Sequence, residues 1–184
     1  DDTPIVVVLQ HPTTTRPSEA GEQMARTLDA VRSVDCYPFI IYPNSDFGSR
    51  EIIGEIHSAA ESWEAVSVYK NVSRSEFLGL LNVCDALVGN SSSGLIEAPS
   101  LDVPVVNVGP RQQGRERADN VIDVPHEREA IERALRTALF DEAFIQRVRA
   151  CDNPFYLDGA AEQIYAHLRD VDIGRDLLEK STEL

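Results

Sequence analysis

A run of small polar residues, Asn90-Ser91-Ser92-Ser93-Gly94, is the segment of the sequence best suited to binding an anion. It follows an apolar stretch of strand length and precedes a helical pattern, so it closes a strand and opens a helix. The free N–H groups of a helix start, together with serine hydroxyls, bind phosphate well. Serine and asparagine are also preferred N-cap residues, so a purely structural role remains the alternative.

Three arginines, Arg111, Arg115 and Arg117, follow another apolar run in an otherwise acidic chain. The planar guanidinium fork matches the oxygens of a phosphate group. Arg115 and Arg117 are equally well explained as solvated partners of Glu116 and Asp119. Arg111 lies nearest the end of the apolar run, and we expect it to be the phosphate ligand.

Three further polar residues are candidates for the same site. His11 directly follows the first apolar run, where an imidazole could shuttle a proton near neutral pH, although a lone histidine is often structural. Glu97 lies one turn into the helix that the serines open, and it could accept hydrogen bonds from a ribose diol or simply favour the helix dipole. Asn44 lies in a segment that reads mostly as a turn. The other histidines, His57, His126 and His167, receive no role.

Short apolar runs alternate with helical patterns along most of the chain, and six of them have strand length. Continuous apolar runs are typical of strands buried on both faces of a parallel sheet. The commonest doubly wound order for six strands is 3-2-1-4-5-6, which places the ligand crevice between the first and fourth strands. The six runs are Ile5 to Gln10, Phe39 to Pro43, Ala65 to Tyr69, Ala86 to Asn90, Pro104 to Val108 and Val121 to Val124.

Helices are expected between these runs and after the last one. Ser73 and Glu76 form a capping-box pattern at the start of the third helix. A last helical region begins at about Ala160, and no stretch of the chain has the composition of a linker. The sequence therefore predicts one α/β domain over residues 1–184, a Rossmann-like doubly wound sheet followed by C-terminal helices.

Composition limits the function classes further. The 184 residues carry a formal net charge of -14, which argues against a nucleic-acid partner. No apolar run approaches the length of about 20 residues that spans a bilayer, so we expect no membrane partner and a cytoplasmic location. The three cysteines show no zinc-binding spacing, and no metal is expected. Only Lys70 and Lys180 are lysines, a balance that suits either a high-salt cytoplasm or an acidic protein from a GC-rich genome.

Four separated motifs resemble the C-terminal domain of the UDP-N-acetylglucosamine 2-epimerases. The resemblance extends to Asn153-Pro154 and Asp158-Gly159, so it covers nearly the whole chain in the right order. The motifs are Gln10-His11-Pro12-Thr13-Thr14-Thr15, Pro43-Asn44-Ser45-Asp46-Phe47-Gly48-Ser49, Gly89-Asn90-Ser91-Ser92-Ser93-Gly94 with Glu97-Ala98-Pro99-Ser100, and Gly109-Pro110-Arg111-Gln112-Gln113-Gly114-Arg115.

This resemblance implies the GT-B fold, in which two Rossmann-like domains close on a UDP-sugar and the C-terminal one holds the nucleotide. It also implies a role for each matching residue, and no cofactor. Ser91 and Ser92 would bind the diphosphate, Glu97 the ribose, Arg111 and Asn44 the UDP moiety, and the main chain near Val72 the uracil. His11 matches a histidine that contacts the phosphates and is implicated in catalysis.

The Asn-Ser-Ser-Ser-Gly form is similar to the hydrolysing branch, which releases UDP and N-acetylmannosamine. The family's N-terminal domain, which supplies acidic groups for proton transfer, has no counterpart in this sequence. We therefore expect a fragment that binds UDP-sugar and is inactive alone. A non-hydrolysing epimerase, the nucleotide half of a GT-B glycosyltransferase and a flavodoxin-like module without ligand are the alternatives, and a homodimer of the full-length enzyme is left open.

Overall fold

A computed structural model describes residues 3–13, 15–171 and 173–174 of the chain. The chain divides into two compact units, residues 1–154 and residues 155–184. All six strands of the described residues lie in the first unit, and the second contains the helix α7, Ala160–Asp170.

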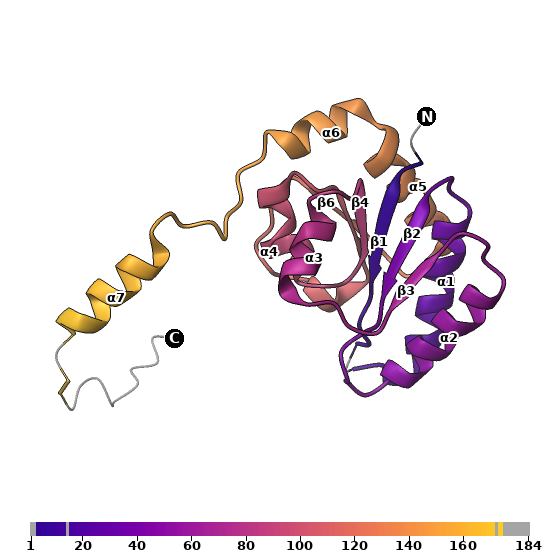
Figure 1. The fold of residues 1–184 in the computed structure, drawn as a ribbon, viewed down its shortest axis with the longest axis horizontal. Coiled ribbons are helices and arrows are strands. Elements are labelled where there is room, and N and C mark those ends of the chain that lie inside the picture. The colour runs from indigo at the N-terminus through magenta and orange to yellow at the C-terminus, as the bar shows by residue number, and fades with distance from the viewer. Residues whose placement is uncertain (1–2, 14, 172, 175–184) are drawn as a thin grey trace. The chain divides into compact units, whose positions relative to one another are not determined.

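The first unit is built on a six-stranded parallel sheet with the order β3-β2-β1-β4-β5-β6, which confirms the predicted doubly wound arrangement (Figure 1). The reversal of order places β1 beside both β2 and β4, so the crevice between β1 and β4 is the switch point. The strands are β1 Ile5–Leu9, β2 Tyr37–Ile41, β3 Ser67–Tyr69, β4 Ala86–Gly89, β5 Val105–Val108 and β6 Val121–Val124.

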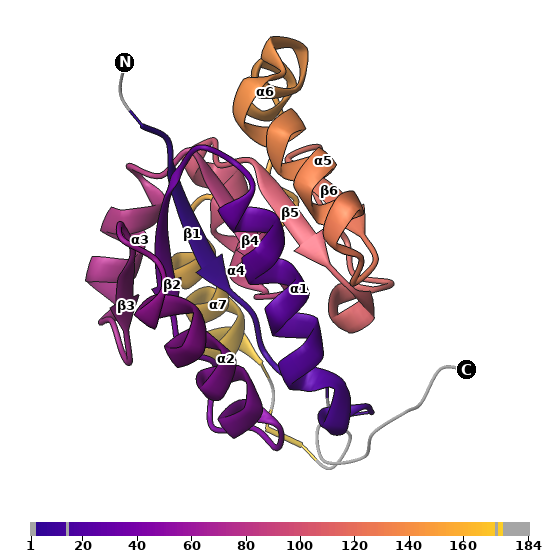
Figure 2. The ribbon, with the colours of Figure 1, turned by 90° about the vertical axis from the view of Figure 1, so that its right-hand side faces the viewer.

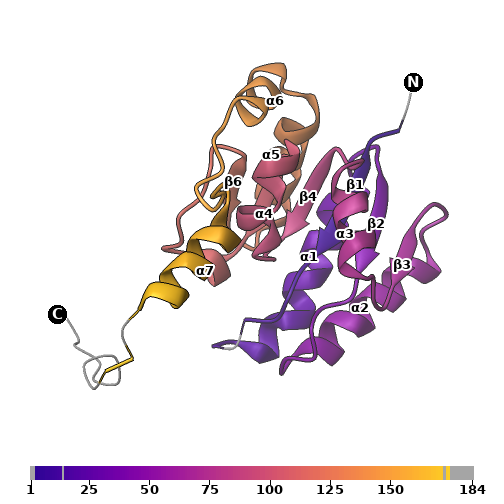
Figure 3. The same cartoon turned by 60° about the vertical axis from the view of Figure 1, so that its left-hand side comes forward.

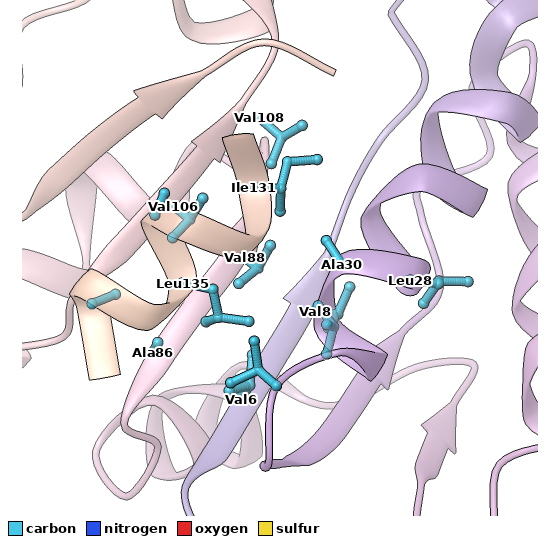
Figure 4. Close-up of a cluster of buried hydrophobic side chains, with 14 of the residues drawn as sticks. Val6, Val8, Leu28, Ala30, Ala86, Val88, Val106, Val108, Ile131 and Leu135 are labelled. Atoms are coloured by element: carbon cyan, nitrogen blue, oxygen red, sulfur yellow. The ribbon is translucent and has the colours of Figure 1, made fainter. Parts of the chain in front are cut away.

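The central strand β1 shows why these apolar runs become buried strands. Successive side chains point to opposite faces of a sheet, so Val6 and Val8 enter one core and Val7 and Leu9 enter the other. Figure 4 shows the first of these cores, where Val6 and Val8 lie beside Leu28, Ala30 and Leu135 and their neighbours. Because both faces are covered, every position of β1 is apolar and a two-residue alternation is absent.

Helices cover both faces of the sheet. The first core contains side chains of α1, α2 and α5, and Figure 2 shows these helices on one face of the sheet. Leu81 of α3 belongs to the second core, and Figure 3 shows α3 and α4 on the opposite face. The helices of the first unit are α1 Ala20–Arg32, α2 Ser49–Glu61, α3 Arg74–Leu81, α4 Ser93–Ile96, α5 Arg128–Phe140 and α6 Glu142–Arg149, with 3₁₀ turns at Pro17–Glu19, Ala98–Leu101 and Pro110–Gln112.

The predicted capping box at the third helix is confirmed. The Ser73 hydroxyl accepts a hydrogen bond from the Glu76 N–H at 3.3 Å, and the Glu76 carboxylate accepts one from the Ser73 N–H at 2.7 Å. The two side chains thus satisfy two main-chain donors that a helix start leaves free, which fixes the first turn of α3 beside the end of β3.

The second unit contains the amphipathic helix α7, which begins at Ala160 as predicted from the sequence. Its large apolar side chains Ile164, Tyr165 and Leu168 are each at least 60% exposed, and no residue of the helix is buried. Within the described part of the chain, no helix has both the length and the apolar character needed to cross a membrane.

Candidate functional site

The switch point is shaped by Gly89, the last residue of β4. Its φ of +136° lies in a region that side chains disfavour, and a Cβ atom there would come within 2.1 Å of the Leu9 carbonyl oxygen. Glycine therefore lets β4 end directly against β1. This close approach brings the next residue, Asn90, beside the residues that follow β1.

Asn90 binds the main chain of His11 with both ends of its side-chain amide. The His11 N–H donates to Asn90 Oδ1 at 2.7 Å, and Asn90 Nδ2 donates to the His11 carbonyl oxygen at 2.9 Å. Asn90 is only 1% exposed, so these bonds are shielded from water. The sequence places Asn90 in an anion-binding motif but does not reveal this positioning role, which depends on the pairing of β1 with β4.

The His11 ring is held in one tautomer by the segment that follows β2. The main-chain N–H of Asn44 donates to His11 Nδ1 at 3.2 Å, so Nδ1 must offer a lone pair and the proton of the neutral ring lies on Nε2. Burial and the neighbouring charge of Arg111 lower the pKa of His11 from 6.5 to about 4. Near neutral pH, the free site therefore contains a neutral imidazole whose Nε2–H is a hydrogen-bond donor.

Arg111 contacts the main chain of Asn90, whereas His11 contacts its side chain. Its Nη1 donates to the Asn90 carbonyl oxygen at 3.0 Å, and the buried Gln112 side chain donates to the same oxygen at 2.7 Å. Burial lowers the pKa of Arg111, but a guanidinium remains charged at neutral pH. Among the described residues Arg111 has no ion-pair partner within 4 Å, so its charge is available for an anion.

The serine run opens a helix, as expected, and that helix is short. Ser91 Oγ accepts a hydrogen bond from the Ser93 N–H at 3.3 Å, and α4 ends after a single turn at Ile96. Pro99 follows in a 3₁₀ turn, because a proline has no N–H for the next α-helical bond. Glu97 therefore lies one turn after Ser93, at the junction of the two turns, and its N–H donates to the Ser93 carbonyl oxygen at 3.0 Å.

One cavity of about 710 Å³ brings together all seven residues expected to hold the ligand. They come from the five segments that follow β1, β2, β3, β4 and β5 at the carboxyl edge of the sheet, although they lie far apart along the chain. Lys70 and Arg74 also line this cavity, and the sequence analysis did not select them. Lys70 is one of only two lysines in the chain and directly follows a predicted strand, so its position could have indicated a role in the site. The seven are His11, Asn44, Val72, Ser91, Ser92, Glu97 and Arg111.

The charges of this cavity distinguish it from a second cavity of similar volume, which is lined by Arg16, Arg26 and His126. There the arginines are paired, Arg16 with Glu19 at 3.6 Å and Arg26 with Glu22 at 2.5 Å. None of the seven expected residues lines that second cavity. An anionic ligand is therefore favoured in the first cavity, where Arg111 has no carboxylate within 4 Å among the described residues and Asp46 acts on it only from a greater distance.

Arg115 and Arg117, for which the sequence left two roles open, separate in the structure. Arg115 lines a smaller adjoining cavity of about 440 Å³ that shares Ser92 and Arg111 with the first. Arg117 points away and binds Asp123 on β6 at 2.5 Å, and neither Glu116 nor Asp119 is its ion-pair partner. Among the described residues, no group of three or more His, Cys, Asp or Glu side chains could hold a metal ion.

The doubly wound sheet and the basic, hydroxyl-rich cavity at its switch point define a Rossmann-like nucleotide-binding domain. A family described as UDP-N-acetylglucosamine 2-epimerase matches residues 1–169. The chain therefore belongs to the UDP-N-acetylglucosamine 2-epimerase family, which confirms the resemblance seen in its motifs.

Individual relatives agree with this assignment. The chain is 34% identical over 183 residues to a UDP-N,N'-diacetylbacillosamine 2-epimerase (hydrolyzing) of Legionella pneumophila, covering 97% of this chain and 46% of that protein. It is 35% identical over 156 residues to the polysialic acid biosynthesis protein P7 of Escherichia coli, covering 84% of this chain and 39% of that protein. The chain thus spans less than half the length of these relatives.

Solved structures support the fold. The UDP-GlcNAc 2-epimerase of Neisseria meningitidis, bound to UDP-GlcNAc, superposes with a TM-score of 0.75 at 17% identity, covering 91% of this chain and 45% of that chain. A second neighbour, from Listeria monocytogenes, has a TM-score of 0.74 at 18% identity and covers 91% of this chain and 44% of its own. The chain has the architecture of the C-terminal half of a GT-B fold, as predicted.

Proposed function

We propose that this chain is the UDP-binding half of a hydrolysing 2-epimerase that acts on UDP-N-acetylglucosamine or a closely related UDP-sugar. The observation that carries the proposal is the convergence of His11, Asn44, Ser91, Glu97 and Arg111 on one cavity at the switch point. These residues belong to separate motifs, and an unrelated module would have no reason to gather them.

The position of each side chain suggests its contact with UDP. Arg111 and the hydroxyls of Ser91 and Ser92 bind the diphosphate, together with the Nε2–H of His11. Glu97 accepts hydrogen bonds from the ribose, and the main chain at Val72 binds the uracil at the far end of the cavity. Donors that are fixed before the ligand arrives stabilise the negative charge that develops on a departing phosphate.

In the full-length protein, the proposed reaction begins with removal of the C2 proton by a base. The bond from C1 to the phosphate oxygen breaks, its electron pair leaves with UDP, and a C1=C2 double bond forms in the sugar. Water then adds its hydroxyl group at C1, and C2 receives a proton on the opposite face. His11 serves as a donor to the leaving phosphate, because its Nδ1 lone pair is already bound by Asn44 and its Nε2 bears a proton.

The hydrolysing outcome is supported by the Asn-Ser-Ser-Ser-Gly motif and by the Legionella relative, whose name specifies a hydrolysing enzyme. That relative is named for UDP-N,N'-diacetylbacillosamine, and a second relative from Campylobacter jejuni, 41% identical over 56 residues, is named for the GDP and UDP forms of the same sugar. A diacetylated UDP-sugar is therefore the second candidate substrate.

Calorimetry with UDP tests the proposed site. Replacement of Arg111 by Ala removes a charge-assisted contact and should weaken UDP binding about tenfold to a hundredfold. Arg26→Ala is the matched control, because Arg26 lines the other large cavity, and it should leave the affinity unchanged. Equal affinity of the wild type and the Arg111 variant would remove Arg111 from the site.

Proton NMR in D₂O tests the division of labour within the full-length enzyme. We expect the 184-residue chain to bind UDP without converting UDP-N-acetylglucosamine. The reason is that we assign the C2 base to a part of the full-length enzyme outside these 184 residues. The full-length protein should give UDP and the free 2-epimeric sugar, and parallel incubations with the two candidate substrates identify the sugar. Deuterium at C2 with the 184-residue chain alone would show that this half carries the base.

A further inference from the structure

Arg111 lies on an irregular loop, residues 109–117, which is held by the bond from Arg111 to the Asn90 carbonyl oxygen and by contacts of other residues of the same loop. Only the 3₁₀ turn Pro110–Gln112 gives this segment regular structure. A long side chain on such a loop can bind a phosphate well only if the loop holds it in one place. The contacts that hold the loop therefore bear directly on ligand binding.

The main chain attaches the loop to β6 at its start, where the Gly109 N–H donates to the Val124 carbonyl oxygen at 2.8 Å, and side chains attach it at two further points. On the cavity side, the buried Gln112 amide donates to the Asn90 carbonyl oxygen, the same oxygen that Arg111 contacts. On the opposite side, Arg117 Nη2 donates to the Gln112 carbonyl oxygen at 2.6 Å, and Arg117 Nε donates to the Arg115 carbonyl oxygen at 3.2 Å. Gln112 is thus held through both its side chain and its main chain.

Arg117 is in turn fixed to the sheet. Its Nη1 lies 2.5 Å and 2.6 Å from the two carboxylate oxygens of Asp123 on β6. Asp123 Oδ1 also accepts a hydrogen bond at 2.7 Å from the side chain of Asn107, a buried residue on β5. Asn107 and Asp123 are register partners in the paired strands, so their spacing is set by the sheet itself.

We propose that Arg117, held by Asp123 and Asn107, is a positioning residue that keeps the loop and therefore Arg111 in the orientation that binds phosphate. The inference rests on the proposed UDP site. Arg117 itself does not line the UDP cavity, and its side chain is 22% exposed. Its effect on the ligand is indirect, through the Gln112 and Arg115 carbonyl groups and the chain that connects them to Arg111.

A double-mutant cycle with Arg117→Ala and Arg111→Ala tests this role. Arg117→Ala should weaken UDP binding by about threefold to tenfold and uridine binding hardly at all, because only the diphosphate reaches Arg111. In the Arg111→Ala background, Arg117→Ala should have no further effect on UDP. Independent, additive losses would show that Arg117 does not act through Arg111 and would overturn the inference.

Two variants provide controls. Arg136 also binds a carboxylate, Glu132, and a main-chain oxygen, that of Ser33, but it lies on α5 away from the cavity, so Arg136→Ala should leave UDP affinity unchanged. Asp123→Asn retains the side-chain volume and a neutral acceptor, and it should reproduce part of the Arg117→Ala effect. If Arg117→Ala does not fold, Asp123→Asn replaces it in the double-mutant cycle with Arg111→Ala.

Hydrogen exchange gives a readout that does not depend on UDP. The Gln113 N–H donates to the Pro110 carbonyl oxygen at 2.9 Å and the Arg115 N–H donates to the Gln112 carbonyl oxygen at 3.3 Å, so both amides report on the loop. Arg117→Ala should accelerate their exchange by about tenfold or more, because a loop that has lost these hydrogen bonds opens locally more often. Exchange as slow as in the wild type would refute the positioning role, whereas a wild-type chain that fails to bind UDP would refute the proposed site alone.

Discussion

The two ends of the proposed UDP cavity differ in how firmly their side chains are held. At the phosphate end, defined here by His11, Asn90 and Arg111, the groups are bound to one another and to the main chain, and His11 is only 6% exposed. The nucleoside end is defined by Lys70, Arg74 and Glu97. Among these three residues the structure shows one ion pair, between Arg74 and Glu97 at 3.5 Å, and the Arg74 side chain is 78% exposed. The structure thus fixes the donors where charge must be stabilised and leaves the other end adaptable.

Asn90→Ala should have the largest effect, and it acts on stability as well as on binding. The change leaves a buried N–H and a buried carbonyl of His11 without partners, at about 1–3 kcal/mol each, so we expect unfolding free energy to fall by at least about 2 kcal/mol. Urea denaturation measures it. A loss within about 0.5 kcal/mol would mean that water replaces Asn90 and that the phosphate end is not rigid.

The pKa of His11 predicts an acid-sensitive stability. Because burial holds the folded pKa near 4, below the ordinary 6.5, the unfolded chain binds the proton more readily. The contribution of the neutral ring is complete above pH 6.5 and is lost as the pH falls toward 4, by roughly 1 kcal/mol at pH 5.5. The difference in unfolding free energy between the wild type and His11→Gln, measured from pH 8 to 5, isolates this histidine from His126, whose pKa burial also lowers. A pH-independent difference would place the His11 ring in water.

Glu97→Ala should produce a moderate effect confined to the ribose. The loss of a partly exposed acceptor should weaken UDP binding by about 1 kcal/mol, or roughly fivefold. The variant should also bind UDP and 2'-deoxy-UDP with similar affinity, whereas the wild type should prefer UDP. Calorimetry with both nucleotides checks this, and a preference that survives the substitution would place the ribose elsewhere.

Arg74→Ala should have the smallest effect. Exposed ion pairs contribute little because water screens both charges, so we expect less than about 0.5 kcal/mol in stability and in UDP binding. A loss as large as that of Arg111→Ala would erase the contrast between the two ends and would make Arg74 a phosphate ligand.

The sequence alone predicted the strand order and the switch point, because continuous apolar runs become buried parallel strands and the right-handed crossover rule restricts the order in which the strands pair. Polar segments at the strand ends pointed to His11, the serines and Arg111, whereas Val72 and the choice of Asn44 came from the family resemblance. The capping box at Ser73 is also predictable, because both of its partners lie within four residues. The sequence predicted that the serine run opens a helix but set no end for it, and in the structure α4 gives way to a 3₁₀ turn that contains Pro99.

Only the tertiary structure decided how the site residues act on one another. The Asn90 contact with His11 joins residues 79 positions apart, and the Asn44 contact that sets the His11 tautomer joins residues 33 positions apart. Arg117 could have paired with a charge beside it in the sequence, yet it binds Asp123 because β5 and β6 pair in a register that presents Asp123 to the loop. Hydrogen bonds depend on distances of about 3 Å and on direction, and such distances between remote segments exist only after the strands have paired and the helices have packed.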